Sequence, residues 1–82
     1  MNRSEILEKI GIILTSVLGH DNFELQENLS AKDVDGWDSL THMIIITEIE
    51  AKFEVRFKLK ELNKLNNMGN LLDLVSNKLA EK

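Results

Sequence analysis

The sequence contains no cysteine, and this absence excludes disulfides, thiolate metal sites and a cysteine nucleophile. Proline is also absent, and the aromatic residues are limited to three Phe and one Trp. Leucine and isoleucine must therefore supply most of the bulk of a core. The composition favours helices, in which leucine is among the better-tolerated residues.

Long hydrophobic runs are also missing. The densest run, Met43–Ile46, is far shorter than the ~20 residues that a membrane-spanning helix needs. The first residues, Met1–Glu5, carry charge but no apolar core or cleavage site typical of a signal peptide. We therefore expect a cytoplasmic protein that does not insert into a membrane.

Basic residues are outnumbered, with 10 Lys and Arg against 14 Asp and Glu, and the net charge is −4 at pH 7. An acidic surface disfavours nucleic acid, because neutralisation of phosphates by Lys and Arg supplies most non-specific affinity. It favours partners that present basic patches. Apolar residues form 43% and charged residues 29% of the chain, which is a globular balance. A chain of 82 residues predicts a single domain over residues 1–82, and we expect a monomer.

The spacing of apolar residues predicts the first helix. They recur at three- and four-residue steps over residues 3–18, as in an amphipathic helix. Asn2 and Glu5 form a candidate capping box at its start. Gly19 is a candidate stop, because glycine readily takes the left-handed conformation after the last turn.

Three further helices are predicted over residues 39–53, 59–65 and 68–80, the last with Asn67 as a candidate cap. Residues 54–58 alternate, and we expect an extended connection with Val55 and Phe57 turned inward. The fold class is therefore all-α: a four-helix bundle with three longer helices and one short helix.

A long connection of residues 19–37 joins the first two helices. It lacks a sustained period, and connections of this length are usually functional or contain a short helical turn. Its isolated apolar residues should hold it over the helices, with Leu29 as the deepest anchor.

The helix over residues 39–53 carries more apolar residues than one core face needs. At about 100° per residue, one sector faces the core. That sector contains Ile45, Ile46, Ile49 and Phe53. A second strip contains Leu40, Ile44, Thr47 and Ala51, with Met43 and Glu50 at its border. This strip either packs on the long connection or forms a docking face for partners.

The segment Gly36-Trp37-Asp38-Ser39-Leu40 places one hydroxyl residue between an acidic, glycine-containing loop and the second helix. Asp38 or Ser39 is predicted to cap that helix, and Asp38 complements the positive end of the helix dipole. An ordinary cap would explain an isolated Asp-Ser-Leu tripeptide. The chain length, the loop and the helical pattern around it point to more than a cap.

Taken together, these features resemble the acyl carrier protein family, which includes peptidyl and aryl carrier domains. The resemblance covers nearly the whole chain. Its core is Asp38-Ser39-Leu40, preceded by Leu29, Val34 and Gly36. It is supported by Glu48–Val55, which is similar to the end of the family's second helix.

The resemblance implies a carrier without catalytic residues or a metal site. Ser39 would bear 4′-phosphopantetheine, joined to it by a phosphopantetheinyl transferase that uses coenzyme A and Mg²⁺, with Asp38 supporting that reaction. The arm would hold acyl or aminoacyl groups as thioesters, and partner enzymes would load and transfer them. We also expect that the interior of the bundle can shelter an acyl chain bound to the arm. The second helix would be the recognition surface, with six residues in contact with partners: Leu40, Met43, Ile44, Thr47, Glu50 and Ala51.

The chain departs from the housekeeping fatty acid carriers at Thr41 and Ile44, where those carriers usually have acids. We therefore predict a carrier for a specialised polyketide, peptide, lipid or sugar-modification pathway. A basic group further along the chain is predicted to be a solvated face that alters the choice of partner. It consists of Arg56, Lys58, Lys60 and Lys64.

Other interpretations remain beside the carrier. An unmodified helical interaction module would use the same strip, with Ser39 as a plain cap. A serine hydrolase would need His42, but residues three apart on one helix do not by themselves make a triad. A calcium loop ending at His42 fails, because its first and last positions lack the required acids. Trp37 is predicted to pack over the loop as a lid.

Overall fold

The computed structural model describes residues 2–81, so Met1 and Lys82 of the predicted domain lie outside the described residues. The elements in chain order are α1 (Arg3–Leu18), the 3₁₀ turn η1 (Ala31–Asp33), α2 (Ser39–Phe53), α3 (Leu59–Leu62) and α4 (Met68–Glu81). Within residues 2–81 there is no strand. The predicted all-α class, with three longer helices and a short one, is confirmed.

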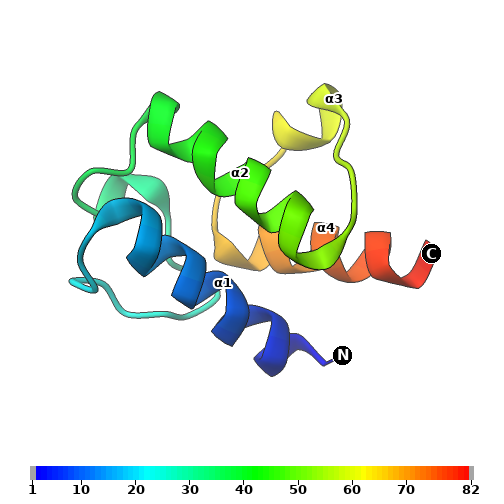
Figure 1. The fold of residues 1–82 in the computed structure, drawn as a ribbon, viewed down its shortest axis with the longest axis horizontal. Helices are drawn as coiled ribbons and strands as arrows, with labels where there is room; N and C mark the ends of the chain where they lie inside the picture. Colours follow the sequence, from blue (N-terminus) through cyan, green and yellow to red (C-terminus); the bar gives the residue numbers. More distant parts are fainter. Residues whose placement is uncertain (1, 82) are drawn as a thin grey trace.

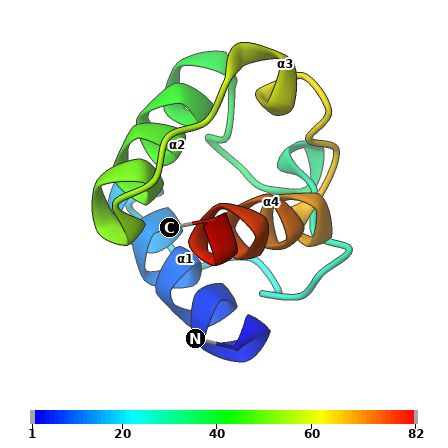
Figure 2. The ribbon, with the colours of Figure 1, turned by 90° about the vertical axis from the view of Figure 1, so that its right-hand side faces the viewer.

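The three long helices surround one core. Helix α1 packs against both α2 and α4, and the chain turns back after α2 so that α3 lies beside that helix (Figure 1). Figure 2 shows α2, α1 and α4 arranged around a common centre, with α3 at the edge. The described part of the chain extends over 33 × 25 × 21 Å.

Both ends of α1 form as predicted. The Asn2 side chain accepts a hydrogen bond from the Glu5 N–H at 2.9 Å, and Glu5 Oε1 accepts one from the Asn2 N–H at 3.4 Å. Gly19 ends the helix at φ +78°, where a residue with a Cβ would be strained. The predicted bounds of this helix therefore follow from its two caps.

The core is built from aliphatic residues of every long helix and of the connection between α1 and α2. The predicted sector of α2 is buried, including Ile45, Ile46, Ile49 and Phe53. The remaining buried hydrophobic residues are Ile6, Ile10, Leu14, Leu29, Val34, Val55, Met68, Leu71, Leu72 and Val75. Because α2 buries this sector, its opposite face points to solvent.

The long connection is anchored on α4. Leu29 is 6% exposed and Val34 is 5% exposed, so two anchors are about equally deep where the sequence predicted one. The backbone carbonyl of Leu29 accepts a hydrogen bond from the Met68 N–H, and that of Glu27 accepts one from the Gly69 N–H, both at 2.7 Å. These bonds satisfy donors at the first turn of α4, which has few partners within the helix.

The predicted third helix is too long. Helix α3 ends at Leu62, three residues before the predicted Leu65. After Leu62 the chain continues in turns, in which the Lys64 N–H donates to the Glu61 carbonyl at 3.3 Å and the Leu65 N–H to the Leu62 carbonyl at 3.2 Å. Two bonds then mark the start of α4: Asn70 Oδ1 accepts from the Asn66 N–H, and Asn67 Oδ1 accepts from the Asn70 N–H, both at 3.0 Å. The second bond confirms Asn67 as the cap of α4.

Candidate functional site at the start of helix α2

Asp38 is the cap of α2. Its Oδ1 accepts a hydrogen bond from the Thr41 N–H at 3.0 Å, and the Thr41 hydroxyl accepts one from the Asp38 N–H at 2.8 Å. Thr41 Oγ1 also donates to the carbonyl of Gly36 at 2.7 Å. Thr41 therefore completes a reciprocal capping box, a role usually played by Glu or Gln at this position. From the sequence alone, Thr41 is distinguished only by standing where the fatty acid carriers usually have an acid.

Ser39 is the first residue of α2, and its side chain is exposed. Because Asp38 supplies the cap, the Ser39 hydroxyl is not needed to satisfy the helix end. Within residues 2–81 it makes no hydrogen bond to another side chain or to the backbone. The hydroxyl is therefore accessible to another molecule and is not held by the fold.

A mostly apolar hollow opens beside Ser39. Its walls also include Ala31, Trp37, His42 and Met43. Behind it lies a cavity of about 40 Å³ that Trp37 and His42 also line, together with residues of the connection and of the segment before α4. Trp37 is half-buried and packs against the core, as predicted for a lid.

Trp37 and His42 form a stacked pair. The Trp37 Nε1–H donates to His42 Nδ1 at 3.1 Å, and the ring centroids are 6.1 Å apart. Burial lowers the pKa of His42 and favours the neutral imidazole, in which Nδ1 accepts the Trp37 bond and the proton is on Nε2. With Nδ1 already occupied and no carboxylate bonded to this ring among residues 2–81, His42 lacks the orienting acid of a hydrolase triad.

The carboxylate of Asp38 is held in its charged form. The hydrogen bonds from the backbone and side chain of Thr41 lower the pKa of Asp38 below its ordinary value of 3.8. A group whose pKa is lowered by folding stabilises the fold above its unfolded pKa. This contribution is lost as the pH falls through the lowered value.

We therefore predict that Asp38→Asn and Asp38→Ala differ. Asparagine retains a cap acceptor but carries no charge, so its variant should be slightly less stable than the wild type at pH 7, whereas alanine should lower the free energy of unfolding further. As the pH falls from the ordinary pKa of 3.8 through the lowered pKa, the wild type should lose its advantage over Asp38→Asn. Urea denaturation at a series of pH values measures both effects. A constant difference between the two proteins across that range would contradict the role assigned to the carboxylate.

The second strip of α2 is exposed. Leu40 is 72%, Met43 50% and Ile44 43% exposed, and Thr47 and Ala51 are also on the surface. The alternative that this strip packs on the long connection is wrong, because that connection is anchored on α4 instead. The predicted docking residues thus lie together on the surface, beginning one residue after Ser39.

Glu50, at the border of the strip, differs from its neighbours. It is half-buried, and its Oε2 accepts a hydrogen bond from the Phe57 N–H at 2.9 Å. Its carboxylate therefore holds the segment between α2 and α3. No local signal in the sequence marks this contact, because the two residues are seven positions apart outside a common helix.

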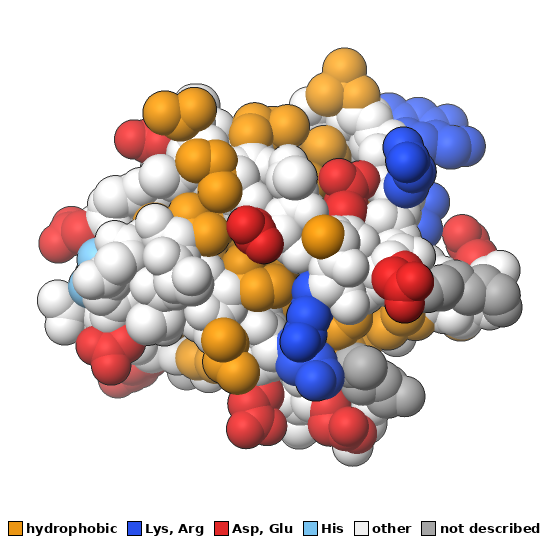
Figure 3. Space-filling model, in the orientation of Figure 1, with side chains coloured by type: hydrophobic (Ala, Val, Ile, Leu, Met, Phe, Trp, Pro, Cys, Tyr) orange, Lys and Arg blue, Asp and Glu red, His pale blue; other side chains and the backbone are white. Residues whose placement is uncertain are grey.

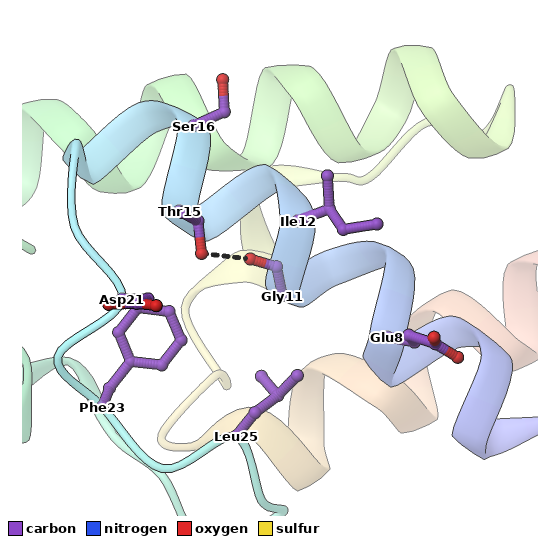
Figure 4. A pocket seen from close by; sticks show the side chains of 8 residues that line it. All are labelled: Glu8, Gly11, Ile12, Thr15, Ser16, Asp21, Phe23 and Leu25. Carbon is purple, nitrogen blue, oxygen red and sulfur yellow. Dashed lines mark hydrogen bonds between the residues drawn. The ribbon is translucent and has the colours of Figure 1, made fainter.

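A second apolar hollow lies between α1 and the connection that follows it (Figure 4). Ile12, Phe23 and Leu25 form its apolar lining, with Glu8 and Asp21 among the polar residues. Gly11 permits the close approach of the Leu25 side chain to the helix. Ser39 and the exposed strip of α2 do not line this hollow.

Across residues 2–81, no cluster of three or more His, Asp or Glu side chains is placed to hold a metal ion. None of the helices in this part of the chain has the length and apolar character required to cross a membrane.

Comparisons with known proteins connect this geometry to a family. No protein-family model matches the chain. The acyl carrier protein of Thermosynechococcus vestitus is 36% identical over 81 residues, which cover 98% of this chain and 99% of the relative. The acyl carrier protein of Thermotoga maritima is 28% identical over 79 residues, covering 96% and 98% of the two chains.

A solved structure gives the same result for the fold. The solution NMR structure of holo acyl carrier protein from Geobacter metallireducens is similar with a TM-score of 0.86. The two sequences are 42% identical, and the similarity covers 93% of this chain and 87% of that one. The arrangement of the helices and the sequence thus point to the same family.

Proposed function

The chain belongs to the acyl carrier protein family, and from this premise we propose that it carries acyl or aminoacyl groups as thioesters on 4′-phosphopantetheine attached to Ser39. The observation that carries the proposal is the Ser39 hydroxyl, which is exposed, free of hydrogen bonds within residues 2–81 and next to a cap that does not need it. A carrier of this kind presents its cargo to partner enzymes and is not itself a catalyst.

The start of α2 suits a phosphate ester. A helix N-terminus favours negative charge through its unpaired N–H groups and its dipole. In the proposed modification, the Ser39 oxygen bonds to the β-phosphorus of coenzyme A. The pyrophosphate bond breaks, the hydroxyl proton goes to a base of the transferase, and 3′,5′-ADP leaves. Asp38 would support this step by positioning Ser39 or the Mg²⁺ of the transferase.

The surroundings of Ser39 fit the attached group. The hollow beside the serine is mostly apolar, and Trp37 and Met43 offer surface to a flexible arm. The group supplies the thiol that this cysteine-free chain lacks, and that thiol holds the cargo. The residues of the chain supply the attachment point, the charge of the helix end and the recognition surface.

We assign partner recognition to the exposed strip of α2. Leu40, Met43 and Ile44 lie within two turns of Ser39, and Thr47, Glu50 and Ala51 extend the surface along the helix. Exposed apolar side chains next to a reactive group are suited to burial by a partner. The Thr41 side chain forms the hydrogen bonds of the cap, and Ile44 is apolar. This face is therefore less acidic than that of the fatty acid carriers, and this difference supports a role in a specialised pathway.

The substitution Ile44→Glu should separate recognition from folding. Ile44 is partly exposed, so the change should lower the free energy of unfolding by less than about 1 kcal/mol. If the transferase or another partner buries this side chain, kcat/KM for loading should fall about tenfold. Ile12→Glu, on the exposed face of α1, is the matched control and should load normally. Loss of stability in proportion to the loss of loading would instead place Ile44 in the core.

The remaining parts of the proposal follow from the family and the composition. We propose one carrier domain over residues 1–82 that acts as a monomer in the cytoplasm, without nucleic acid and without insertion into a membrane. Its partners are a phosphopantetheinyl transferase and the enzymes that load and receive the acyl or aminoacyl group.

Intact-mass spectrometry tests this function. The apo-protein is incubated with coenzyme A, Mg²⁺ and a phosphopantetheinyl transferase of broad specificity, and its mass should rise by one phosphopantetheine. An unmodified interaction module would show no gain with any of several transferases, and that result would refute the carrier function. Hydrolysis of activated esters by the apo-protein would point to a serine hydrolase instead.

A further inference from the structure

Four basic side chains lie near α3 without an ion pair in the described part of the chain. Arg56, Lys58, Lys60 and Lys64 are exposed, and no ion pair forms at any of them within residues 2–81. Residues 55–65 contain these four cations and one acid, for a net charge of +3, whereas the rest of the chain has a net charge of −7. The positive charge is therefore concentrated in a protein that is acidic elsewhere.

Two acids near this region, Glu50 and Glu61, are bonded to other parts of the fold. Glu50 accepts a hydrogen bond from the Phe57 N–H at 2.9 Å. Glu61 accepts one from the Lys58 N–H at 2.7 Å, and its other oxygen pairs with Lys78 at 2.9 Å. The bonds from Lys58 and Lys78 also lower the pKa of Glu61. Both carboxylates are thus turned toward the protein.

One large apolar side chain stands among these cations. Leu59 is 73% exposed, more than any other large hydrophobic residue in the described chain. The alternation of the preceding segment explains the arrangement: Val55 and Phe57 face the core, so Arg56 and Lys58 face solvent. We call Arg56, Lys58, Leu59, Lys60 and Lys64 the α3 patch.

Helix α3 lies beside α2, because the connection after α2 turns back from the carboxyl end of that helix (Figure 1). Figure 3 shows Lys and Arg side chains gathered on this side of the molecule beside hydrophobic ones. The loop that leads to Ser39 instead carries Asp33 and Asp35, followed by Asp38 at the cap of α2.

We propose that the α3 patch binds reversibly to the surface of an anionic phospholipid bilayer. Lipid headgroups of negative charge attract clustered Lys and Arg side chains, and an exposed leucine adds affinity when it enters the interface. A protruding leucine among flexible cations suits a fluid surface, because such a surface needs no pocket of matching shape. An acidic protein partner, in contrast, would need a pocket of matching shape for the exposed leucine.

The local cluster of cations decides the binding, and the net charge of the chain does not. The attraction acts within a Debye length of about 8–10 Å at physiological salt, which is much shorter than the 33 Å length of the molecule. The inference does not depend on whether Ser39 is modified.

Co-sedimentation with vesicles tests the proposal. The intact chain is mixed at low salt with vesicles of phosphatidylcholine alone or with added phosphatidylglycerol. Binding should require phosphatidylglycerol and weaken as salt is raised. The double variant Lys58→Glu/Lys60→Glu should lose about tenfold or more in partition coefficient, since each basic residue near the surface is worth roughly a factor of five. Leu59→Ser should lose about threefold to tenfold.

A matched control separates the patch from net charge. Lys9→Glu/Lys32→Glu makes the same change in charge on α1 and the long connection, and it should bind like the wild type. Circular dichroism confirms that each variant is folded. The proposal is overturned if the wild type does not bind the anionic vesicles, or if the control loses as much binding as the patch variant. The proposal would also be overturned if the protein bound polyglutamate as strongly as the anionic vesicles and if Leu59→Ser did not weaken that binding. Such a result would show a general attraction to polyanions.

Discussion

Ser39→Ala should abolish the gain of one phosphopantetheine while leaving the fold intact. The proposed bond forms at the Ser39 oxygen, and alanine has no atom to accept the phosphoryl group. The side chain is exposed and Asp38 provides the cap of α2, so removal of the hydroxyl leaves no buried donor or acceptor without a partner. Intact mass after incubation with transferase and coenzyme A measures the first effect, and urea denaturation the second.

Ser16→Ala is the control for this experiment. Ser16 is an exposed serine on α1, away from the start of α2, so its variant should load like the wild type. A mass gain that persists in Ser39→Ala would show that another residue bears the group, and the assignment of Ser39 would then be wrong. Loss of the gain together with loss of the fold would contradict the structural role given to Asp38.

Ile49→Ala should unfold much of the population. Ile49 is 0% exposed at the centre of the buried sector of α2, and truncation of such a side chain costs about 2–5 kcal/mol. A small domain of this kind has a net stability of roughly 5 kcal/mol or less, so the loss consumes most of it. Urea denaturation followed by circular dichroism should show a transition shifted to much lower urea, with little native baseline.

Ile44→Ala provides the comparison within the same helix. The chemical change is identical, but Ile44 already contacts water, so the loss should be below about 1 kcal/mol. Similar transitions for the two alanine variants would contradict the division of α2 into a buried sector and an exposed strip. The difference between them also measures how far the surface next to Ser39 is independent of the core.

Local signals in the sequence predicted much of the fold. The capping box of Asn2 and Glu5 and the left-handed Gly19 fix the bounds of α1, and both involve residues a few positions apart. The periodicity of α2 predicted its buried sector, because the geometry of a helix fixes which side chains share a face. Asp-Ser-Leu at 38–40 likewise identified the candidate site, whose modification remains a prediction.

Other contacts of the site could not be predicted from local signals in the sequence. Thr41 completes the cap, although the sequence pattern suggested only a missing acid. The contact between Trp37 and His42 joins the loop to the first turn of the helix, and Glu50 binds the backbone at Phe57. Each contact depends on how the chain turns at a helix end, which residue types alone do not specify.

The sequence by itself determined the three long helices, their caps, the inward sector of α2 and the position of Ser39 at a helix start, because these depend on interactions over a few residues. Tertiary structure decided which surfaces remain open. The long connection bonds to the first turn of α4 through Leu29 and Glu27, and this leaves the strip of α2 beside Ser39 uncovered. The same folding turns Glu50 and Glu61 toward the protein, and the cations of the α3 patch form no ion pair within residues 2–81. The exposure of a side chain depends on the tertiary fold, because a residue is buried only where another segment of the chain packs against it.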